Sequence, residues 1–356
     1  MEETSHKLVE SCQGGYVLLS FLLPVYNVKD YLEDCIQSIV QQDLEGIEYE
    51  IICIDDNSTD GSYEYLLELA KKKQGITILK NAENKGVSYT RNRLIREAKG
   101  KYVWFVDPDD MVFKNAAKSF LYKAEEVNAD ILLGNYIRVE ETTKGNADYV
   151  TNWDMIGTNP EQKKQYLPID QHGKMMCSVC PGLFLRSFLL ENNLWMNEKM
   201  IAQEDTLFYY EFSLKTKNVY KWEVPCYLYR QRKSSVMNTH NEERNKKYYI
   251  SMREMLKVYI KHLENGDYTD LNVLERKIHH SKQNVVTCLA MIHDKKYIKS
   301  QLKLLRKEKS YPYKFRKEVF KSSDSFLRKV LIYLLPIKPF FWLYHFLYTV
   351  YDKNRR

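Results

Sequence analysis

The sequence lacks the glycine-rich loops of the two commonest classes of nucleotide-binding enzyme. Neither G-x-G-x-x-G nor G-x-x-x-x-G-K-[ST] occurs in its 356 residues. The first motif binds the pyrophosphate of dinucleotides, and the second cradles the phosphates of ATP and GTP. Their absence counts against NAD-dependent and ATP-dependent enzymes. The chain also has no internal repeat and no low-complexity tract, which excludes repeat architectures.

Cysteine is present without the spacing of a metal site. The seven cysteines include one C-x-x-C pair, Cys177 and Cys180, and only His172 lies close to it in the sequence. A zinc site would need a second pair or nearby histidines. The sequence therefore predicts core thiols in a reducing compartment.

The N-terminal residues do not show the pattern of a secretory leader. The N-terminus has no basic segment, and its one apolar run, Tyr16 to Val25, is interrupted by Ser20 and has no small-residue cleavage site after it. We interpret this run as a buried strand and expect a cytoplasmic protein.

The composition is that of a globular protein. Hydrophobic residues make up 44% of the chain and charged residues 28%, and the length allows one large domain or two ordinary ones. Aromatic residues reach 13%, with 28 tyrosines. Such a content fits sugar-facing clefts or membrane interfaces, although most of these side chains are expected in the core.

Residues 15–110 alternate short apolar runs with helical patterns. The predicted strands are YVLLSFLLP, YEIICID, ITILKN and KYVWFVD, and YLEDCIQSIVQQ, SYEYLLELAKKK and VSYTRNRLIREA lie between them as helices. This alternation predicts an α/β fold with a mostly parallel sheet and helices on both faces. In such sheets ligands bind beyond the carboxyl ends of the strands, where the polar clusters of this chain lie.

Three carboxylates follow the fourth predicted strand within four positions, as Asp107, Asp109 and Asp110 in DPDD. Pro108 favours an extended conformation at Asp107, so the strand should continue to that residue and then turn. Several carboxylates at one turn suit a hard divalent cation that completes its shell with waters and phosphates. The alternative is a surface turn, and one of the three is expected to cap the following helix in either case.

A similar cluster, DDNSTDG at residues 55–61, follows the second predicted strand. Asn57 and Ser58 suit a turn, and Asp60 or Ser62 suits a helix N-cap. Asp55 and Asp56 remain, and a carboxylate at a strand end can accept the imide N–H of a pyrimidine or a ribose hydroxyl.

These motifs, in this order, resemble the family 2 glycosyltransferases of the GT-A (Rossmann-like) fold. The resemblance rests on FLLPVYNVKDYLEDCIQSIVQQ, IICIDDNSTDGS and NKGVSYTRNRLIREAKGKYVWFVDPDD, and it covers roughly residues 17–240. It implies an inverting transfer of a sugar from a nucleotide diphosphate donor. It also implies that Asp56 binds the base, usually uracil, and that Asp109 binds Mn²⁺ or Mg²⁺ directly with Asp107 nearer the ribose. The other nucleotide-binding residues implied are Pro24, Tyr26, Asn27, Asp55 and Arg91.

The resemblance extends to a catalytic base. Inverting transfer needs a group that takes the proton of the acceptor hydroxyl. Family members carry an ED at the start of a helix, which AQEDTLFYYEF matches, so Asp205 is implied as the base and Glu204 as a neighbour that orients the acceptor. Without the resemblance, acids at a helix N-terminus would be explained by the helix dipole alone.

YLYRQRKSSVMN resembles a further family segment, with Arg230 and Arg232 placed to bind the diphosphate. Ser234 replaces a common glycine, so the local turn is expected to differ. The Q-x-x-R-W of processive members is absent, which favours the addition of a single sugar. Residues 177–198 lie where the family places its acceptor wall, but their C-x-x-C departs from the usual pattern and leaves the acceptor open.

The end of the chain is basic and apolar together. Residues from Lys295 to Arg356 include 17 Lys/Arg and 4 Asp/Glu, a net of +13 in a chain of +7, so the first 294 residues carry −6. Val330 to Tyr351 has no acidic residue but contains Pro336, Lys338 and Pro339. We expect an interfacial or re-entrant helical pair on an anionic membrane rather than a span. The alternative is a helix that covers the core or a homodimer partner; nucleic acid is disfavoured because the tail is too apolar.

The expected organisation follows from these segments. Residues 1–14 form a flexible N-terminus, 15–240 a glycosyltransferase domain (15–120 for the nucleotide, 121–240 for the acceptor), 241–322 a basic helical region and 323–356 a membrane-associating tail. The expected enzyme is peripheral on the inner face of the cell membrane and uses a glycan or polyprenyl-linked glycan acceptor. The alternatives are a nucleotidyltransferase of similar fold, which would normally show a glycine-rich basic loop after its first strand, and an inactive nucleotide-sugar-binding module.

Overall fold

The computed structural model describes residues 17–73, 75–141, 163–165, 178–216, 218–232, 242–308, 310–311 and 338–353. Cys177, His172 and Ser234 lie outside these ranges. The chain divides into two compact units. The sheet unit comprises Met1–Asp170, Met175–Glu198 and Asp205–Ser235, and the helical unit comprises Gln171–Lys174, Lys199–Glu204 and Val236–Arg356.

One sheet forms the centre of the sheet unit, with strand order β3-β2-β1-β4-β8-β6-β9-β5 and β7 paired to β9. The first four strands in chain order are β1 (Leu19–Val25), β2 (Tyr49–Asp55), β3 (Ile76–Lys80) and β4 (Tyr102–Phe105). All three pairs among them are parallel. These are the four strands that the sequence predicts, and β1 is buried along its whole length, as expected for a strand covered on both faces.

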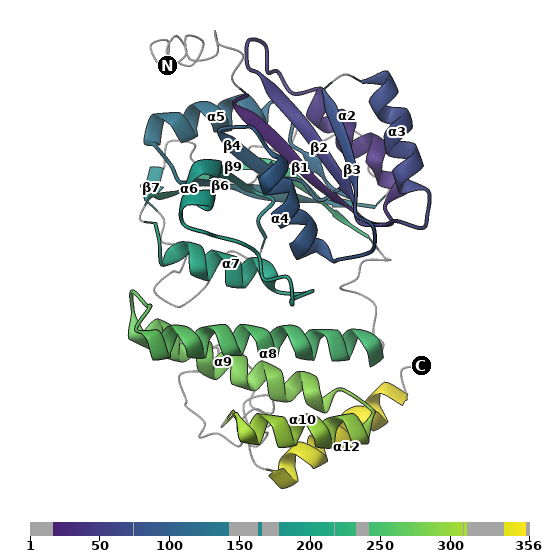
Figure 1. Ribbon diagram of the computed structural model, residues 1–356, viewed down its shortest axis with the longest axis vertical. Helices are drawn as coiled ribbons and strands as arrows, with labels where there is room; N and C mark the ends of the chain where they lie inside the picture. Colours follow the sequence, from purple (N-terminus) through teal and green to yellow (C-terminus); the bar gives the residue numbers. More distant parts are fainter. Residues whose placement is uncertain are drawn as a thin grey trace. The chain divides into compact units, whose positions relative to one another are not determined.

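The helices between these strands also follow the prediction: α2 (Leu32–Val40), α3 (Ser62–Lys72) and α4 (Val87–Glu97), with a short 3₁₀ helix, η1 (Lys29–Tyr31), before α2. The chain moves from β1 to β2 to β3 in one direction and then returns past them to β4. Right-handed crossovers therefore place α2 and α3 on one face of the sheet and α4 on the other (Figure 1).

The other half of the sheet is mixed, whereas the sequence predicts a mostly parallel sheet. β8 (Gly182–Leu185) runs antiparallel to β4 and to β6 (Ile131–Glu140), and β6 is parallel to β9 (Val219–Gln231). The short strands β5 (Met111–Val112) and β7 (Lys163–Gln165) run antiparallel to β9. α5 (Ala116–Val127) packs on β6, β8 and β9.

The apolar stretch that follows Cys180 has a helix-like pattern in the sequence, but its first part is not helical. Residues 182–185 form β8, and α6 (Arg186–Glu191) begins only after it. Leu183 and Phe184 are fully buried between β4 and β6. A short apolar run has the same periodicity in a buried strand as in a buried helix, so this strand could not be distinguished in the sequence. α7 (Glu204–Ser213) follows, and its first residue belongs to the helical unit.

The helical unit contains α8 (Glu242–Asn265), α9 (Leu271–Ala290), α10 (Lys295–Lys307) and α12 (Lys338–Lys353). In α8, Tyr249, Met252, Leu256, Tyr259 and Leu263 recur at spacings of three and four and share one face. The first four are buried, whereas Leu263, near the end of the helix, is 38% exposed. α8 ends before Gly266, whose φ of 74° favours glycine.

Of the predicted C-terminal tail, the structure describes one helix, α12; residues 323–337, which include the first part of the predicted helical pair, lie outside the described ranges. Phe341 and His345 are buried, and α12 packs on α9, where His345 Nδ1 lies 3.0 Å from the carbonyl oxygen of Ala290. Leu343, Phe346 and Leu347 remain 51%, 62% and 49% exposed. Within the described ranges, no helix has the length and apolar character needed to cross a membrane.

Candidate active site

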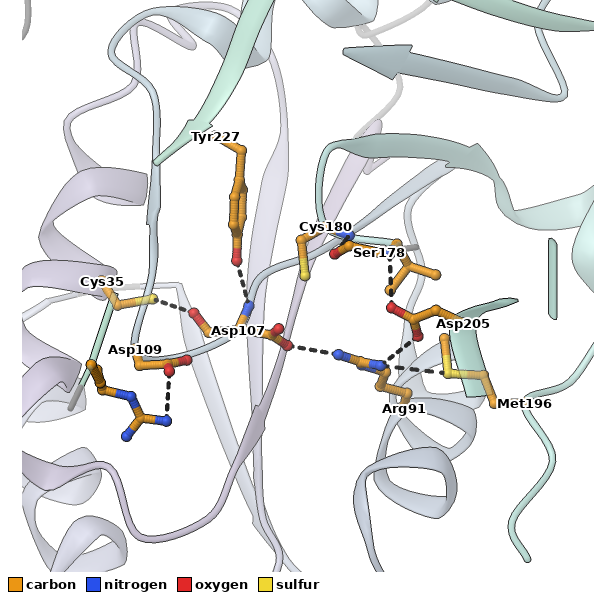
Figure 2. A network of polar contacts seen from close by, with 11 residues as sticks. Cys35, Arg91, Asp107, Asp109, Ser178, Cys180, Met196, Asp205 and Tyr227 are labelled. Atoms are coloured by element: carbon orange, nitrogen blue, oxygen red, sulfur yellow. Dashed lines mark hydrogen bonds and ion pairs between the residues drawn. The ribbon is translucent and has the colours of Figure 1, made fainter. Parts of the chain in front are cut away.

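The polar clusters of the sheet unit meet where parallel strands end. Asp107 and its turn follow β4, Asp55 ends β2 directly beside Val25 of β1, and Tyr26 and Asn27 follow β1. Because the carboxyl ends of parallel strands lie at one edge of a sheet, these side chains share that edge. Figure 2 shows the part of this edge around Asp107.

A tight turn carries the three carboxylates of DPDD. The backbone N–H of Asp110 donates to the carbonyl of Asp107 at 2.9 Å, with Pro108 at the second position, which proline favours. Asp110 is 2% exposed and accepts the backbone N–H of Arg230 at 2.8 Å. Burial, and then the charges of Asp109 and Asp107, raise the pKa of Asp110 well above its usual value. Asp110 thus fastens the turn to β9.

None of these carboxylates caps the following helix, contrary to the expectation from the sequence. The turn leads into β5 and not into a helix, and α5 begins only at Ala116. Asn115 stands at the N-cap of α5 in a left-handed conformation, with no capping hydrogen bond from its side chain. The β5 strand was missed because two residues carry no periodic signal.

The side chain of Arg91, on α4, contacts both Asp107 in the DPDD turn and Asp205, the residue predicted to be the base. Its Nη2 lies 2.8 Å from Asp107 Oδ1 and its Nη1 lies 2.9 Å from Asp205 Oδ1 (Figure 2). The side chain of Arg91 is 5% exposed, that of Asp205 11% and that of Asp107 32%. The ion pair with Asp205 is therefore shielded from water, where such contacts are stronger than at the surface.

Asp205 is fixed on both of its oxygens. Oδ2 accepts the backbone N–H of Val179 at 3.1 Å while Oδ1 faces Arg91. Asn92, the next residue of α4, donates to the carbonyl of Met196 and to Glu198, each at 2.9 Å. Asn92 thereby holds the segment before α7 against α4, a role that sequence reasoning missed although the residue lies beside Arg91 in the TRN triplet.

Asp109, the second carboxylate of the DPDD turn, forms an ion pair with Arg232. Arg232 Nη2 lies 2.6 Å from Asp109 Oδ2, and the side chain of Asp109 is 20% exposed. Burial and the nearby Asp107 raise the pKa of Asp109, while the Arg232 guanidinium acts in the opposite direction. Arg230 and Arg232 are the two residues predicted to bind the diphosphate. They lie close together, because their guanidinium groups are 5.3 and 5.1 Å from the centre of the same Tyr31 ring.

Arg230 is more deeply engaged than Arg232. It is 4% exposed, and its Nη2 lies 3.2 Å from Asp34 of α2. Tyr31, beneath both guanidinium groups, donates its hydroxyl to Glu141 at 2.8 Å. Sequence reasoning did not single out Asp34 or Tyr31, because nothing in the α2 pattern distinguishes them from ordinary helix-surface residues.

The loop after β1 is tied to the DDNSTDG loop. Asn27 has a φ of 51°; its backbone N–H donates to Ser58 Oγ at 3.0 Å and its side-chain oxygen accepts the N–H of Thr59 at 2.8 Å. Tyr26 is 47% exposed beside this connection, and Pro24 is buried in β1. Of the three residues predicted for the base pocket, Tyr26 and Asn27 are exposed and Pro24 is buried.

The side chains of Asp56 and Asp55 differ in how many hydrogen bonds they accept. Asp56 accepts from Asn81 Nδ2 at 2.7 Å and from the backbone N–H groups of Lys85 and Gly86 at 2.9 and 2.7 Å. Its carboxylate is therefore occupied in closing the loop before α4. Asp55 is fully buried and accepts the N–H of Ser58 at 3.0 Å through Oδ1, while Oδ2 has no partner among the described residues.

A cation would find two carboxylates at this edge. Among the residues that the structure describes, no three His, Cys, Asp or Glu side chains converge as a metal site. Asp107 and Asp109 are nevertheless both partly exposed on one turn. That donor set fits a hard divalent cation held by one or two carboxylates and completed by phosphate oxygens and water.

Comparison with known proteins agrees with this arrangement. Residues 20–191 match the family model described as glycosyl transferase family 2. These residues form a family 2 glycosyltransferase domain. Over 203 residues, 56% of its length, the chain is 32% identical to a poly(ribitol-phosphate) beta-glucosyltransferase of Bacillus spizizenii, of which 30% is covered. It is 29% identical to glycosyltransferase GlyG of Streptococcus pneumoniae, over 62% of this chain and 73% of that protein.

Solved structures show the same fold. S. aureus TarS 1–349 in complex with UDP-GlcNAc matches with a TM-score of 0.56 and 17% identity, over 95% of this chain and 92% of that one. The chain shares the GT-A fold of the TarS structure, with its mixed sheet and C-terminal helices. The chain spans less than a third of the Bacillus spizizenii relative.

Proposed function

We propose that this glycosyltransferase transfers a sugar from a UDP-sugar to a hydroxyl of a glycan, with inversion and with Asp205 as base. The observation that carries the proposal is the position of Asp205, which Arg91 separates from the Asp107 turn by two ion pairs of 2.9 and 2.8 Å. An inverting enzyme needs its base apart from the groups that hold the departing diphosphate. The Arg91 bridge supplies that separation.

The proposed donor is a nucleotide diphosphate with a uracil base. TarS, which shares the fold, binds UDP-GlcNAc in its crystal structure. A buried oxygen without a partner is costly, and Asp55 Oδ2 is such an oxygen at the strand edge. We therefore assign recognition of the imide N–H to Asp55 rather than to Asp56, whose oxygens already accept three hydrogen bonds.

Mn²⁺ or Mg²⁺ would be held by Asp109 and Asp107, as the chemistry of the turn suggests. When bound, such a cation would neutralise the negative charge of the leaving diphosphate. Arg232 and Arg230 lie beside the same turn and are placed to bind phosphate oxygens with their guanidinium groups. Arg232 would have to exchange Asp109 for the diphosphate when the donor binds.

Asp205 would take the proton of the acceptor hydroxyl while the oxygen of that hydroxyl forms its bond to C1 of the sugar. The ion pair with Arg91 favours the ionised carboxylate, which is the form that a base requires. The backbone N–H of Val179 orients the second oxygen. Glu204, one residue earlier, would orient the acceptor.

The proposed acceptor is a surface or lipid-linked polysaccharide that receives a single sugar. The name of the Bacillus spizizenii relative gives poly(ribitol-phosphate) as its acceptor. The helical unit suggests a peripheral position at an anionic membrane, because α10 is rich in lysine and α12 exposes Leu343, Phe346 and Leu347.

A donor screen tests the transferase proposal. The full chain is incubated with Mn²⁺ and single UDP-, GDP-, CDP- and dTDP-sugars, and release of the free nucleotide diphosphate is followed with and without glycan acceptors. We expect UDP release from one or a few UDP-sugars, which an acceptor accelerates. Release of pyrophosphate from a nucleoside triphosphate and a sugar phosphate would instead indicate a nucleotidyltransferase and contradict the proposal.

A further inference from the structure

An exposed pair of tyrosines lies on the sheet beside the DPDD turn. Tyr136 of β6 and Tyr229 of β9 are 46% and 39% exposed, and their ring centroids lie 6.0 Å apart with planes inclined at 70°. Tyr229 stands between Leu228 and Arg230, which are both buried, and Tyr136 follows an irregularity in the register of β6. Neither ring is needed to fill the core.

The register places Tyr229 on the face of β9 that also carries Tyr227, a residue in contact with the DPDD turn. In the parallel β6–β9 pair, Tyr136 is opposite Tyr227 and Arg138 is opposite Tyr229. Side chains two residues apart on a strand share a face, so Tyr229 lies on the same face as Tyr227. The hydroxyl of Tyr227 accepts the backbone N–H of Asp107 at 3.0 Å (Figure 2). Tyr229 therefore lies two positions along β9 from a residue that contacts the DPDD turn.

The electrostatics agree with this proximity. Partial burial, and then the negative charges of Asp110, Asp109 and Asp107, raise the pKa of Tyr229. Leu228 and Arg230 on the opposite face of β9 are buried, and on the face of Tyr229 burial ends after Tyr227, which is 2% exposed. The exposed rings thus face the space next to the site and not the interior.

A guanidinium without an acidic partner completes the surface. Arg138 is exposed and lies 5.9 Å from the centre of the Tyr136 ring, and its Nη2 lies 3.5 Å from the Tyr136 hydroxyl. Within the described ranges, no carboxylate lies at ion-pair distance from Arg138. Glu140 and Gln231 are the next exposed residues on this face, beyond Arg138 and Tyr229.

We propose that Tyr136, Tyr229 and Arg138 form a saccharide subsite for the acceptor, which takes a sugar ring that bears an anionic group. The aromatic rings offer a flat apolar surface to the C–H face of the sugar, and the Tyr229 hydroxyl offers a hydrogen bond. Arg138 offers a fork of donors to a carboxylate or a phosphate. The inference rests on the proposed transferase function, because it gives that function its acceptor class.

Saturation-transfer NMR on the full chain tests the subsite without turnover. The protein is first saturated with UDP and Mg²⁺, which is diamagnetic, so that phosphate groups of the probes do not occupy the donor pocket. The probes are glucose, glucuronate and glucose 6-phosphate. We expect stronger transfer to the ring protons of the two anionic sugars than to those of glucose, and the stronger of the two distinguishes a carboxylate from a phosphate acceptor.

Substitutions distinguish the contribution of the two tyrosine rings from that of Arg138. Tyr136→Ala and Tyr229→Ala should each lower the signal of all bound sugars about fivefold, because a stacking surface is lost. Arg138→Gln should remove only the preference for the anionic sugars. Tyr229→Phe, which keeps the ring, should retain the signal, and Tyr268→Ala, which removes an exposed tyrosine of the helical unit, is the matched control.

Equal signals in the wild type, Tyr136→Ala and Tyr229→Ala would overturn the subsite. A preference for anionic sugars that survives Arg138→Gln would overturn the assignment to Arg138. Because no sugar is transferred in this experiment, a chain that releases no UDP in the donor screen still gives a result here. Failure of the subsite and failure of the transferase proposal are therefore distinguishable.

Discussion

Arg91 donates one guanidinium nitrogen to Asp107 at 2.8 Å and another to Asp205 at 2.9 Å. A residue of α4 thus joins the end of β4 to the first turn of α7, although the two carboxylates are 98 positions apart in the sequence. The guanidinium balances two negative charges that would otherwise repel each other. The geometry of the site depends on this one side chain.

Replacing Arg91 with glutamine should destabilise the sheet unit. Asp205 would be left shielded from water without its cation, and removal of one partner from a buried pair typically costs about 3–5 kcal/mol. Chemical denaturation measures the free energy of unfolding. Arg138→Gln, at an exposed arginine without an acidic partner, is the control and should change the same quantity by less than about 0.5 kcal/mol. A similar small change in both variants would contradict the central role of Arg91.

Substitutions of Asp55 and Asp56 should have different effects: Asp55 should affect recognition of the base, and Asp56 should affect the stability of the fold. Asp56→Asn should lower stability by about 1–3 kcal/mol, because a backbone N–H of Lys85 or Gly86 loses its acceptor. Asp55→Asn should leave the fold intact, since the remaining oxygen still accepts from Ser58, but weaken UDP and favour CDP. Calorimetric affinities for UDP and CDP, with melting temperatures, measure both effects. The reverse pattern would return base recognition to Asp56.

Donor binding should depend on a cation and on pH through Asp109. EDTA or Asp109→Asn should abolish most of the UDP affinity, with Asp43→Asn, an exposed surface acid, as control. The raised pKa of Asp109 means that protons compete with the cation at a higher pH than for an ordinary aspartate. Affinity should therefore fall as pH decreases through that pKa and be restored above it. Calorimetry with and without EDTA that shows equal affinity would contradict the metal role.

Much of the sheet unit could be predicted from the sequence because its signals are local. Four strands and three helices follow from runs such as YEIICID and from the spacing of α2, and strand-end carboxylates identify the binding edge. β8 could not be predicted, because GLFL carries the same pattern in a strand and in a helix. The engagement of Asp56 by residues 81–86 also could not be predicted, since a loop contact leaves no periodic trace.

The tail was predicted only in part for a similar reason. Its aromatic and apolar residues indicate burial but do not say whether protein or lipid covers them. α12 divides them, with Phe341 and His345 packed in the helical unit and Leu343, Phe346 and Leu347 exposed. The distinction depends on which side of one helix meets α9, and the chain composition does not specify it.

Membrane association should depend on the exposed side of α12. Replacing Leu343, Phe346 and Leu347 with serine should release the protein from anionic liposomes, because each buried apolar side chain contributes about 1.5–3 kcal/mol. High salt alone should release the wild type only partly, since salt screens the lysines but not apolar burial. Sedimentation with liposomes measures both, and Leu67→Ser, at an exposed leucine of α3, is the control. Equal, negligible pelleting of wild type and variant would remove the membrane proposal.

The role of Asp205 as the base is tested most directly by measuring turnover and donor affinity in Asp205→Asn and in the wild type. The substitution keeps the shape of the side chain and an acceptor for Val179 but removes the base, so the rate of sugar transfer should fall by about 10²–10⁴-fold. The affinity for UDP should stay close to the wild-type value, because only the transition state needs the base. Glu204→Gln is the matched control and should reduce transfer far less. Transfer near the wild-type rate in Asp205→Asn would show that another group accepts the proton, and the central claim would be wrong.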